Sequence, residues 1–525
     1  MTIQNKPFTW LFALLFIVAI SILGIQLRAI HNAAGTLSRV KVEGGYISGT
    51  FNATDDVYIF KGIPFAAPPV GDLRWRAPGP VKPWSGVRKC ETFGPSPMQR
   101  KPAPFSMWSS EFLIPGEPIS EDCLYLNVWT GARTSQEKRP VLVWIYGGGF
   151  VSGGSAVPIY DGEAMAKKGV VFVSINYRVG IFGFFAHPQL TTQSGRRASG
   201  NYGLMDQIAA LKWVQHNIAA FGGDPKNVTI AGQSAGSMSV NCLVASPLAK
   251  GLFHRAIAES GAGFINRTVG LQKAEAEGIK VMRSLGLTAI NDLRALPVEE
   301  LMKLKPDHMA PIIDGYVLPD AIPNIFKEGK ANKVDLLTGW NEEEGLTLGP
   351  IRKAQDFQQE AAGKYGPDLS SFLQYYPAGN DTQAAVSQLK LARDIIFGVQ
   401  NYTWANVQSE FGGKTYVYRF IHRPPATGAY TKYGAFHTAE VPYAFNNLQF
   451  VNRPWKEEDR SLAEIMSSYW ANFARTGNPN WKGLPVWEVY KKGDKRIMLL
   501  GKEPKMGRLE DEGALEFMSK RMAGN

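Results

Sequence analysis

The chain is 525 residues long, with 45% hydrophobic and 20% charged residues and a formal net charge of +11. This composition is ordinary for a soluble globular protein and excludes a disordered or fibrous chain. The basic residues are scattered singly and in pairs, such as Lys167-Lys168 and Arg196-Arg197. We therefore expect a solvated basic surface and no nucleic-acid partner.

The N-terminal segment differs in composition from the rest of the chain. Residues 8–27 contain no charged side chain and are just long enough to span a bilayer, while Ala33-Ala34-Gly35 offers a weak cleavage signal. We expect residues 1–35 to be a signal peptide or a membrane anchor, which puts the protein outside the cytoplasm, either secreted or periplasmic. No linker interrupts residues 36–525, which we interpret as a single domain, and the pattern predicts no oligomeric state.

Three cysteines occur in the chain. Cys90 and Cys123 bracket a proline-rich loop, and a disulfide between them would stabilise the fold by about 3 to 4 kcal/mol in the chain-entropy model. Cys242 falls in an apolar, helix-like stretch and is interpreted as a buried thiol. Because no Cys-x-x-Cys, His-Glu-x-x-His or phosphate-loop pattern occurs, we expect no metal and no cofactor.

Short apolar runs bounded by glycine or polar turns predict buried strands. These runs are residues 141–146, 170–175 and 228–231. Apolar residues recur at helical spacing over 201–220, between the last two runs. Alternation of strand and helix predicts an α/β fold with a mostly parallel sheet and a site at the carboxyl ends of its strands. The stretch 270–412 is more helical and irregular, and part of it is predicted to form a cap around the pocket.

Three consecutive glycines, Gly147 to Gly149, follow the first predicted strand. Glycines let backbone N–H groups approach a ligand without interference from Cβ, as the oxyanion of a tetrahedral intermediate requires. A dinucleotide loop is the weaker interpretation, because the spacing up to Ser152 breaks that pattern. We expect Gly148 and Gly149 to be oxyanion donors.

The third predicted strand runs into Gly232-Gln233-Ser234-Ala235-Gly236, which is followed by an apolar helix-like stretch. In this context Gly-x-Ser-x-Gly forces the serine into strained backbone geometry and lifts its hydroxyl clear of the sheet. The pattern predicts Ser234 as a nucleophile and the N–H of Ala235 as a third oxyanion donor. A glycine-rich helix N-terminus without chemistry is the alternative.

A general base and an acid should follow the nucleophile in the chain. His437 lies in a turn-rich loop after the predicted strand 415–420, whereas His422 is close to the end of that strand and is interpreted as a surface residue. For the acid, spacing alone leaves open the adjacent glutamates 342–344 and also Asp314.

Three stretches identify a family resemblance. They are Ser120–Asn127, Gly200–Gln207 and Phe221–Gly236. With these motifs the chain resembles the type-B carboxylesterase and cholinesterase family from about Val40 to its last tryptophans. The resemblance implies an α/β-hydrolase fold, with a twisted sheet, flanking helices and helical cap insertions. It also implies Glu344 as the acid and His437 as the base, a supporting hydrogen bond from Ser260 to the acid, and the Cys90–Cys123 bridge.

The residue before the nucleophile is Gln233, where choline-hydrolysing members of the family carry a glutamate, and this difference argues against choline esters. Trp108 lies roughly where those members place a cation-binding tryptophan, but a packing role is favoured for it. Four further apolar residues near the motifs are candidates for lining the acyl and alcohol pockets, or else belong to the core. They are Phe150, Trp340, Phe397 and Phe445.

The motifs and the resemblance together predict a serine carboxylesterase that needs no cofactor. We expect it to hydrolyse small, neutral, moderately apolar esters through an acyl-enzyme on Ser234. One alternative is a catalytically silent cell-surface recognition protein of the same fold. Another is a hydrolase of amides, carbamates or thioesters, which the same residues would serve.

Overall fold

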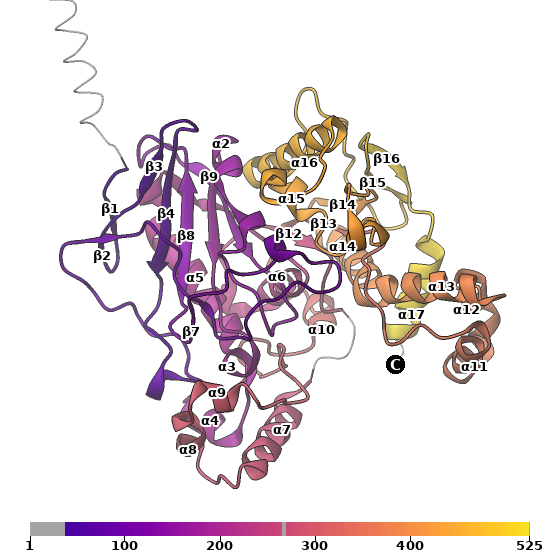
Figure 1. Cartoon of the computed structure of the whole chain (residues 1–525), viewed down its shortest axis with the longest axis horizontal. Coiled ribbons are helices and arrows are strands. Elements are labelled where there is room, and N and C mark those ends of the chain that lie inside the picture. The colour runs from indigo at the N-terminus through magenta and orange to yellow at the C-terminus, as the bar shows by residue number, and fades with distance from the viewer. Residues whose placement is uncertain (1–36, 265–268, 524–525) are drawn as a thin grey trace, which may run out of the picture.

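A computed structural model describes residues 37–264 and 269–523 (Figure 1). Within them an 11-stranded sheet has the order β16-β15-β14-β13-β12-β11-β9-β10-β8-β4-β3. Strands β10, β9, β11, β12, β13, β14 and β15 pair in parallel, while the strands at both edges are antiparallel. The bounds are β3 Thr50–Asn52, β4 Val57–Pro64, β8 Tyr125–Thr130, β9 Arg139–Ile145, β10 Val171–Ile175, β11 Gly223–Gln233, β12 Arg255–Glu259, β13 Asp335–Asn341, β14 Thr415–Phe420, β15 Arg496–Leu500 and β16 Lys505–Arg508.

The predicted α/β class and mostly parallel sheet are confirmed. The three predicted strands correspond to β9, β10 and β11, whose apolar side chains are buried as in a sheet covered on both faces. The predicted helix is α5, Tyr202–Asn217, followed by a 3₁₀ turn that ends at Gly222 with φ 78°. Only glycine adopts this conformation without strain, so the chain turns there into β11.

Helices cover the sheet and extend beyond it. Helices α5, α6 and α14 pack against β11 to β14, while α2 and α16 pack against β8 to β11. Their bounds, with those of the remaining helices, are α2 Glu163–Lys167, α3 Gly180–Phe184, α4 Pro188–Gln193, α6 Ala235–Ala245, α7 Leu271–Ser284, α8 Ile290–Ala295, α9 Val298–Leu301, α10 Ile322–Lys327, α11 Ala354–Tyr365, α12 Leu369–Tyr375, α13 Asp381–Arg393, α14 Val399–Phe411, α15 Val441–Ala444, α16 Glu457–Thr476 and α17 Glu512–Ala523.

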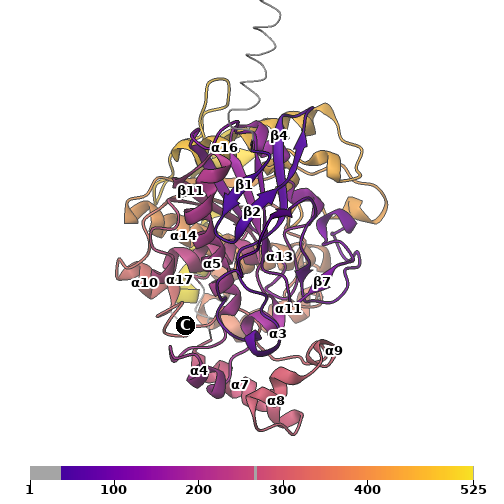
Figure 2. The same cartoon turned by 90° about the vertical axis from the view of Figure 1, so that its left-hand side faces the viewer.

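The stretch 270–412 is helical, as predicted, except where β13 returns to the sheet. Its first helices, α7 to α9, gather with α4 at one end of the molecule, beyond the sheet (Figures 1 and 2). Two small sheets flank the main one. Their strands are β1 Val40–Val42, β2 Gly45–Ser48 and β5 Val87–Lys89 in one, and β6 Ser96–Pro97 and β7 Ile119–Ser120 in the other.

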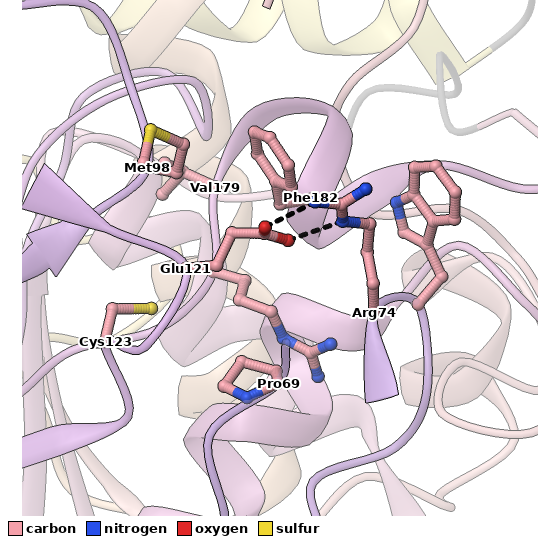
Figure 3. A pocket seen from close by; sticks show the side chains of 9 residues that line it. Pro69, Arg74, Met98, Glu121, Cys123, Val179 and Phe182 are labelled. Carbon is pink, nitrogen blue, oxygen red and sulfur yellow. Dashed lines mark hydrogen bonds and ion pairs between the residues drawn. The ribbon is translucent and has the colours of Figure 1, made fainter. Parts of the chain in front are cut away.

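The predicted disulfide is wrong for this structure, in which Cys90, Cys123 and Cys242 are all free and buried. The Cys90 carbonyl accepts the N–H of Lys61, whereas the carbonyl of Leu124, next to Cys123, accepts that of Phe65. Cys90 and the neighbour of Cys123 are therefore hydrogen-bonded to positions four residues apart in sequence, Lys61 and Phe65. Cys123 instead borders a small cavity beside Met98 (Figure 3).

The predicted membrane segment, residues 8–27, lies outside the described residues. Over the part of the chain that is described, no helix combines the length and apolarity that a membrane span needs.

Candidate active site

Ser234 occupies a tight turn between β11 and α6. Its backbone has φ 59° and ψ −123°, a conformation that L-residues rarely adopt and that costs strain. A side chain at Gly232 would collide with the backbone of Gly236, and one at Gly236 would collide with the carbonyls that end β9. The two glycines therefore permit the turn that the sequence motif predicts, and Ser234 is left half-buried at the carboxyl end of the sheet.

The glycine loop lies directly against this turn. A Cβ on Gly147 would approach the Gln233 carbonyl to 2.6 Å and the Ser234 Cβ to 2.9 Å. Gly148 and Gly149 follow with φ 115° and 62°, and both are exposed. Ala235 begins α6, so its N–H belongs to the positive end of the helix macrodipole. The three predicted donors thus belong to two segments that meet at Ser234.

His437 and Glu344 form a buried pair. The His437 Nδ1 and Glu344 Oε2 atoms are 2.6 Å apart, and the two residues are 3% and 0% exposed. The other carboxylate oxygen, Oε1, accepts the Ser260 hydroxyl and the Asn341 N–H, each at 2.8 Å. With both oxygens bonded, the carboxylate is fixed in orientation and favours the imidazole tautomer with its proton on Nδ1.

The alternative acids face other partners. Glu342 forms ion pairs with Arg393 and Arg419 at 3.2 and 3.5 Å. Glu343 forms one with Arg423. Asp314 accepts three successive backbone N–H groups in a turn, from Tyr316, Val317 and Leu318. Of these four carboxyl groups, Glu344 is the one that contacts His437 within the described residues.

The interpretation of His422 as a surface residue is wrong. His422 is 8% exposed, and its Nε2 lies 2.7 Å from Asp459 Oδ1. The hydroxyl of Tyr443 donates to the same carboxylate oxygen at 2.8 Å. This histidine therefore belongs to a separate buried network.

Two of the proposed pocket residues contact the imidazole of His437. Phe397 stacks on it with ring centroids 4.4 Å apart and an interplanar angle of 20°. Phe397 lies in a π-helical turn, Asp394–Gly398, an irregularity that is frequent at functional sites. Trp108 meets the imidazole edge-on at 6.2 Å, and its indole N–H donates to Thr438 Oγ1 at 3.2 Å. The Trp108 ring is therefore part of the site's surroundings, not of a remote packing surface.

Three other pocket candidates lie in the core. Trp340 and Phe445 have no exposed surface, and Phe445 packs edge-on against Trp144 and Phe172. Phe150 is 4% exposed and packs edge-on against Phe184. Nearness to a motif in sequence therefore does not by itself place a side chain at the site.

Gln233, the third proposed pocket residue near His437, also contacts the imidazole. Its buried amide nitrogen lies 3.2 Å from His437 Nε2 and 3.3 Å from Nδ1. With Nδ1 protonated toward Glu344, the contact with Nε2 is the one in which the amide can donate. In the described part of the chain no hydrogen bond joins the Ser234 hydroxyl to His437, an arrangement common in ligand-free sites.

Two buried glutamates beside the site were not predicted. Burial raises the pKa of Glu259 to about 8, and burial followed by the charges of Glu259 and Glu344 raises the pKa of Glu440 well above its ordinary value. Each has one oxygen without a partner among the described residues, as a protonated carboxyl tolerates better than a carboxylate. The side chain of Asn341 donates to Glu440. In the sequence, Glu259 directly precedes Ser260 and Glu440 lies three residues after His437. This nearness to two candidate site residues was the signal from which the two glutamates could have been found.

The described residues contain no group of three or more metal-ligating side chains arranged to hold an ion. The arrangement around Ser234 offers a hydroxyl, an imidazole held by a carboxylate, and backbone N–H groups of the neighbouring glycine loop and helix start. These are the parts of nucleophilic acyl transfer.

Comparison with known proteins gives one consistent result. A family model described as the carboxylesterase family matches residues 36–518. The chain is 37% identical over 474 residues to a fumonisin B1 esterase of Sphingopyxis macrogoltabida, covering 85% of this chain and 84% of that protein. It is also 37% identical over 502 residues to a liver carboxylesterase of Sus scrofa, covering 86% of each, and 35% identical over 490 residues to carboxylesterase 1C of Rattus norvegicus, covering 86% of each.

Proposed function

The chain belongs to the carboxylesterase family and is a carboxylic-ester hydrolase of the α/β-hydrolase fold, and on this premise we propose that Ser234, His437 and Glu344 are its catalytic triad. The observation that carries the proposal is the buried His437–Glu344 pair, 2.6 Å apart, beside a strained serine turn that the glycine loop contacts. This combination supports acyl transfer through a serine nucleophile.

In the proposed mechanism the Ser234 hydroxyl attacks the ester carbonyl while Nε2 of His437 takes its proton. The Nδ1–H bond to Glu344 stabilises the imidazolium that forms. The backbone N–H groups of Gly148, Gly149 and Ala235 hold the oxyanion. Collapse of the tetrahedral intermediate transfers the proton to the leaving alcohol and leaves an acyl-enzyme. Water then attacks the acyl group and gives a proton to the imidazole. As the second tetrahedral intermediate collapses, the imidazolium returns that proton to the Ser234 oxygen, which frees the serine and releases the acid.

We propose neutral, moderately apolar esters as substrates. The aromatic rings of Phe397 and Trp108 border the general base, and apolar surroundings favour uncharged acyl and alcohol groups. Gln233 beside the imidazole carries no charge that could hold a cationic substrate. Two relatives, a fumonisin B1 esterase and a liver carboxylesterase, are consistent with ester substrates of different kinds.

The test is hydrolysis of p-nitrophenyl esters from acetate to decanoate by the full chain and by its Ser234→Ala variant. Activity that falls by at least about a thousandfold in the variant supports the triad, and the chain-length optimum measures the acyl pocket. Ser467→Ala is the matched control, since this buried hydroxyl donates to the carbonyls of Ala463 and Glu464 within α16. A folded wild-type protein that hydrolyses none of these esters would favour a recognition role, and faster cleavage of amides or thioesters would contradict the ester assignment.

We also propose that residues 8–27 carry the enzyme to the outside of the cytoplasm and can tether it to the membrane. The uncharged segment supports this proposal. Fractionation of cells that express the full chain should find esterase activity in the membrane or extracytoplasmic fractions. Replacing Leu14 and Ile20 by arginine should move the activity to the cytoplasm, and wild-type activity in the cytoplasm alone would contradict the proposal.

A further inference from the structure

A cavity of about 200 Å³ lies between α4, α8, the start of α5 and the segment that contains Trp75. Helices α4 and α8 lie at the end of the molecule beyond the sheet (Figures 1 and 2). Three arginines line the cavity, Arg76, Arg196 and Arg294. The rest of its wall is mixed, with apolar side chains such as Trp75 and Leu190 beside the polar Gln193 and Ser194. No residue of the candidate active site lines it.

The arginines of this cavity lack carboxylate partners within the described residues. Arg294 is 5% exposed, yet its guanidinium donates only to neutral acceptors, namely the Arg74 carbonyl at 3.1 Å, Asn291 Oδ1 at 2.6 Å and Gln193 Oε1 at 3.0 Å. Neighbouring Arg74, in contrast, forms a two-pronged ion pair with Glu121 (Figure 3). A buried cation without a counter-ion is costly, so the Arg294 site is one that a bound anion would stabilise.

The two exposed arginines add to this positive charge. The Nε of Arg76 donates to the Asp72 carbonyl at 2.7 Å. The two terminal nitrogens of the Arg76 guanidinium take no part in this hydrogen bond. The guanidinium of Arg196 lies over the Tyr316 ring at 5.3 Å. Burial, followed by the charge of Arg76, lowers the pKa of Arg294, although the charge of Asp72 partly offsets this. The lining of the cavity therefore carries three cationic groups and no acidic one.

We propose that this cavity binds a small organic polycarboxylate. Guanidinium groups recognise carboxylates through paired N–H···O bonds, and three of them match an anion with two or three carboxylates. The apolar part of the wall, which includes Trp75 and Leu190, suits the carbon skeleton of such an anion better than it suits a fully hydrated inorganic ion. The oxyanion chemistry is shared with phosphate, so the test must separate the two. The site is independent of the ester hydrolysis proposed above.

The test is isothermal titration calorimetry of the full chain with citrate, succinate, acetate and inorganic phosphate at low ionic strength. Affinity should rise from acetate through succinate to citrate, exceed that for phosphate, and fall when salt screens the charges. Arg76→Gln and Arg196→Gln should each weaken citrate binding about tenfold, the loss of one charge-assisted contact. Arg197→Gln is the matched control, because Arg197 neighbours Arg196 but does not line the cavity.

Arg294→Lys keeps the charge but loses the planar fork, and it should also weaken citrate binding. Arg294 also holds α8 against the carbonyl of Arg74. The binding result for Arg294→Lys is therefore used only if its thermal unfolding matches that of the wild type. If it does not, the variants of the exposed residues Arg76 and Arg196 decide the test. Equal weakening by Arg197→Gln would reveal general surface attraction and overturn the proposal. Phosphate binding as tight as that of citrate would also overturn the proposal. So would the absence of saturable citrate binding up to about 10 mM citrate, which is about ten times a Kd of 1 mM.

Discussion

Replacing Glu344 by glutamine removes the negative charge next to the imidazole and changes little else in size. The Glu344 carboxylate is fully buried and holds His437 Nδ1 at 2.6 Å. The oxygen of the new amide can still accept the Ser260 and Asn341 donors. Its nitrogen would face the imidazole, and an N–H facing Nδ1 favours the tautomer that has no lone pair free on Nε2.

The size of the effect follows from the burial of this pair. Breaking a buried ion pair costs about 3 to 5 kcal/mol, and in the transition state the imidazole carries a full positive charge. That energy corresponds to a loss of about 10² to 10⁴ in kcat/KM. Because the interaction strengthens only as the imidazolium forms, kcat should fall while KM stays nearly constant. Initial rates with p-nitrophenyl butyrate over a range of concentrations separate the two parameters.

The adjacent glutamates supply the controls. Glu343→Gln removes a partly exposed ion pair with Arg423, and Glu342→Gln weakens the pairing with Arg393. Partly exposed pairs contribute about 1 kcal/mol or less, so each variant should keep kcat/KM within about fivefold of the wild type. The reasoning would be refuted if Glu344→Gln retained activity within about tenfold, or if a folded Glu343→Gln variant lost as much.

Three further changes test the surroundings of the triad. Ser260→Ala removes one of three bonds to Glu344 and should lower kcat about tenfold, while Ser467→Ala leaves kcat unchanged, as Michaelis–Menten kinetics will check. The pKa of Glu259 is raised from 4.5 to about 8, so this group contributes stability that is fully present below pH 4.5 and lost as the pH rises through 8. The loss amounts to a few kcal/mol in the free energy of unfolding. Urea unfolding from pH 5 to 9 should show this fall in the wild type and a flatter dependence in Glu259→Gln. Gln233→Glu puts a negative charge near the imidazole, so the acidic limb of the kcat/KM profile should move upward by about one pH unit; an unmoved limb would contradict the contact.

Local sequence signals predicted the fold where a structural element is also a run of one kind of residue. Strands β9 and β10 are mostly apolar, with only Arg139 at the start of β9 and Ser174 within β10 as polar members, and their bounds differ by a residue or two from those predicted. Strand β11 begins earlier than predicted, at Gly223 instead of Val228, because Gly223 pairs with Arg139 of β9 ahead of an irregularity in register that spans the polar residues 224–227. Backbone pairing of polar residues leaves no hydrophobic pattern to follow.

The candidate site was predictable where a motif is contiguous and not where contacts join distant segments. Ser234 and the glycine loop owe their geometry to neighbouring glycines, so the sequence motif already contains the steric reason. The buried carboxyls Glu259 and Glu440, in contrast, come together only through packing. The Cys90–Cys123 bridge is absent from the structure for a related reason, since the length of the loop between two cysteines does not determine whether packing brings them together.

The most direct test of the central claim is the identity of the nucleophile. Wild-type protein would be inactivated with one equivalent of a fluorophosphonate, which phosphonylates an activated serine with loss of fluoride, and its peptides would be analysed by mass spectrometry. The account predicts a single added phosphonyl group on Ser234, with loss of esterase activity in proportion to labelling. It also predicts that the Glu344→Gln variant is labelled much more slowly than the wild type. Inactivation with the label on another residue, or full esterase activity after complete labelling of Ser234, would contradict it.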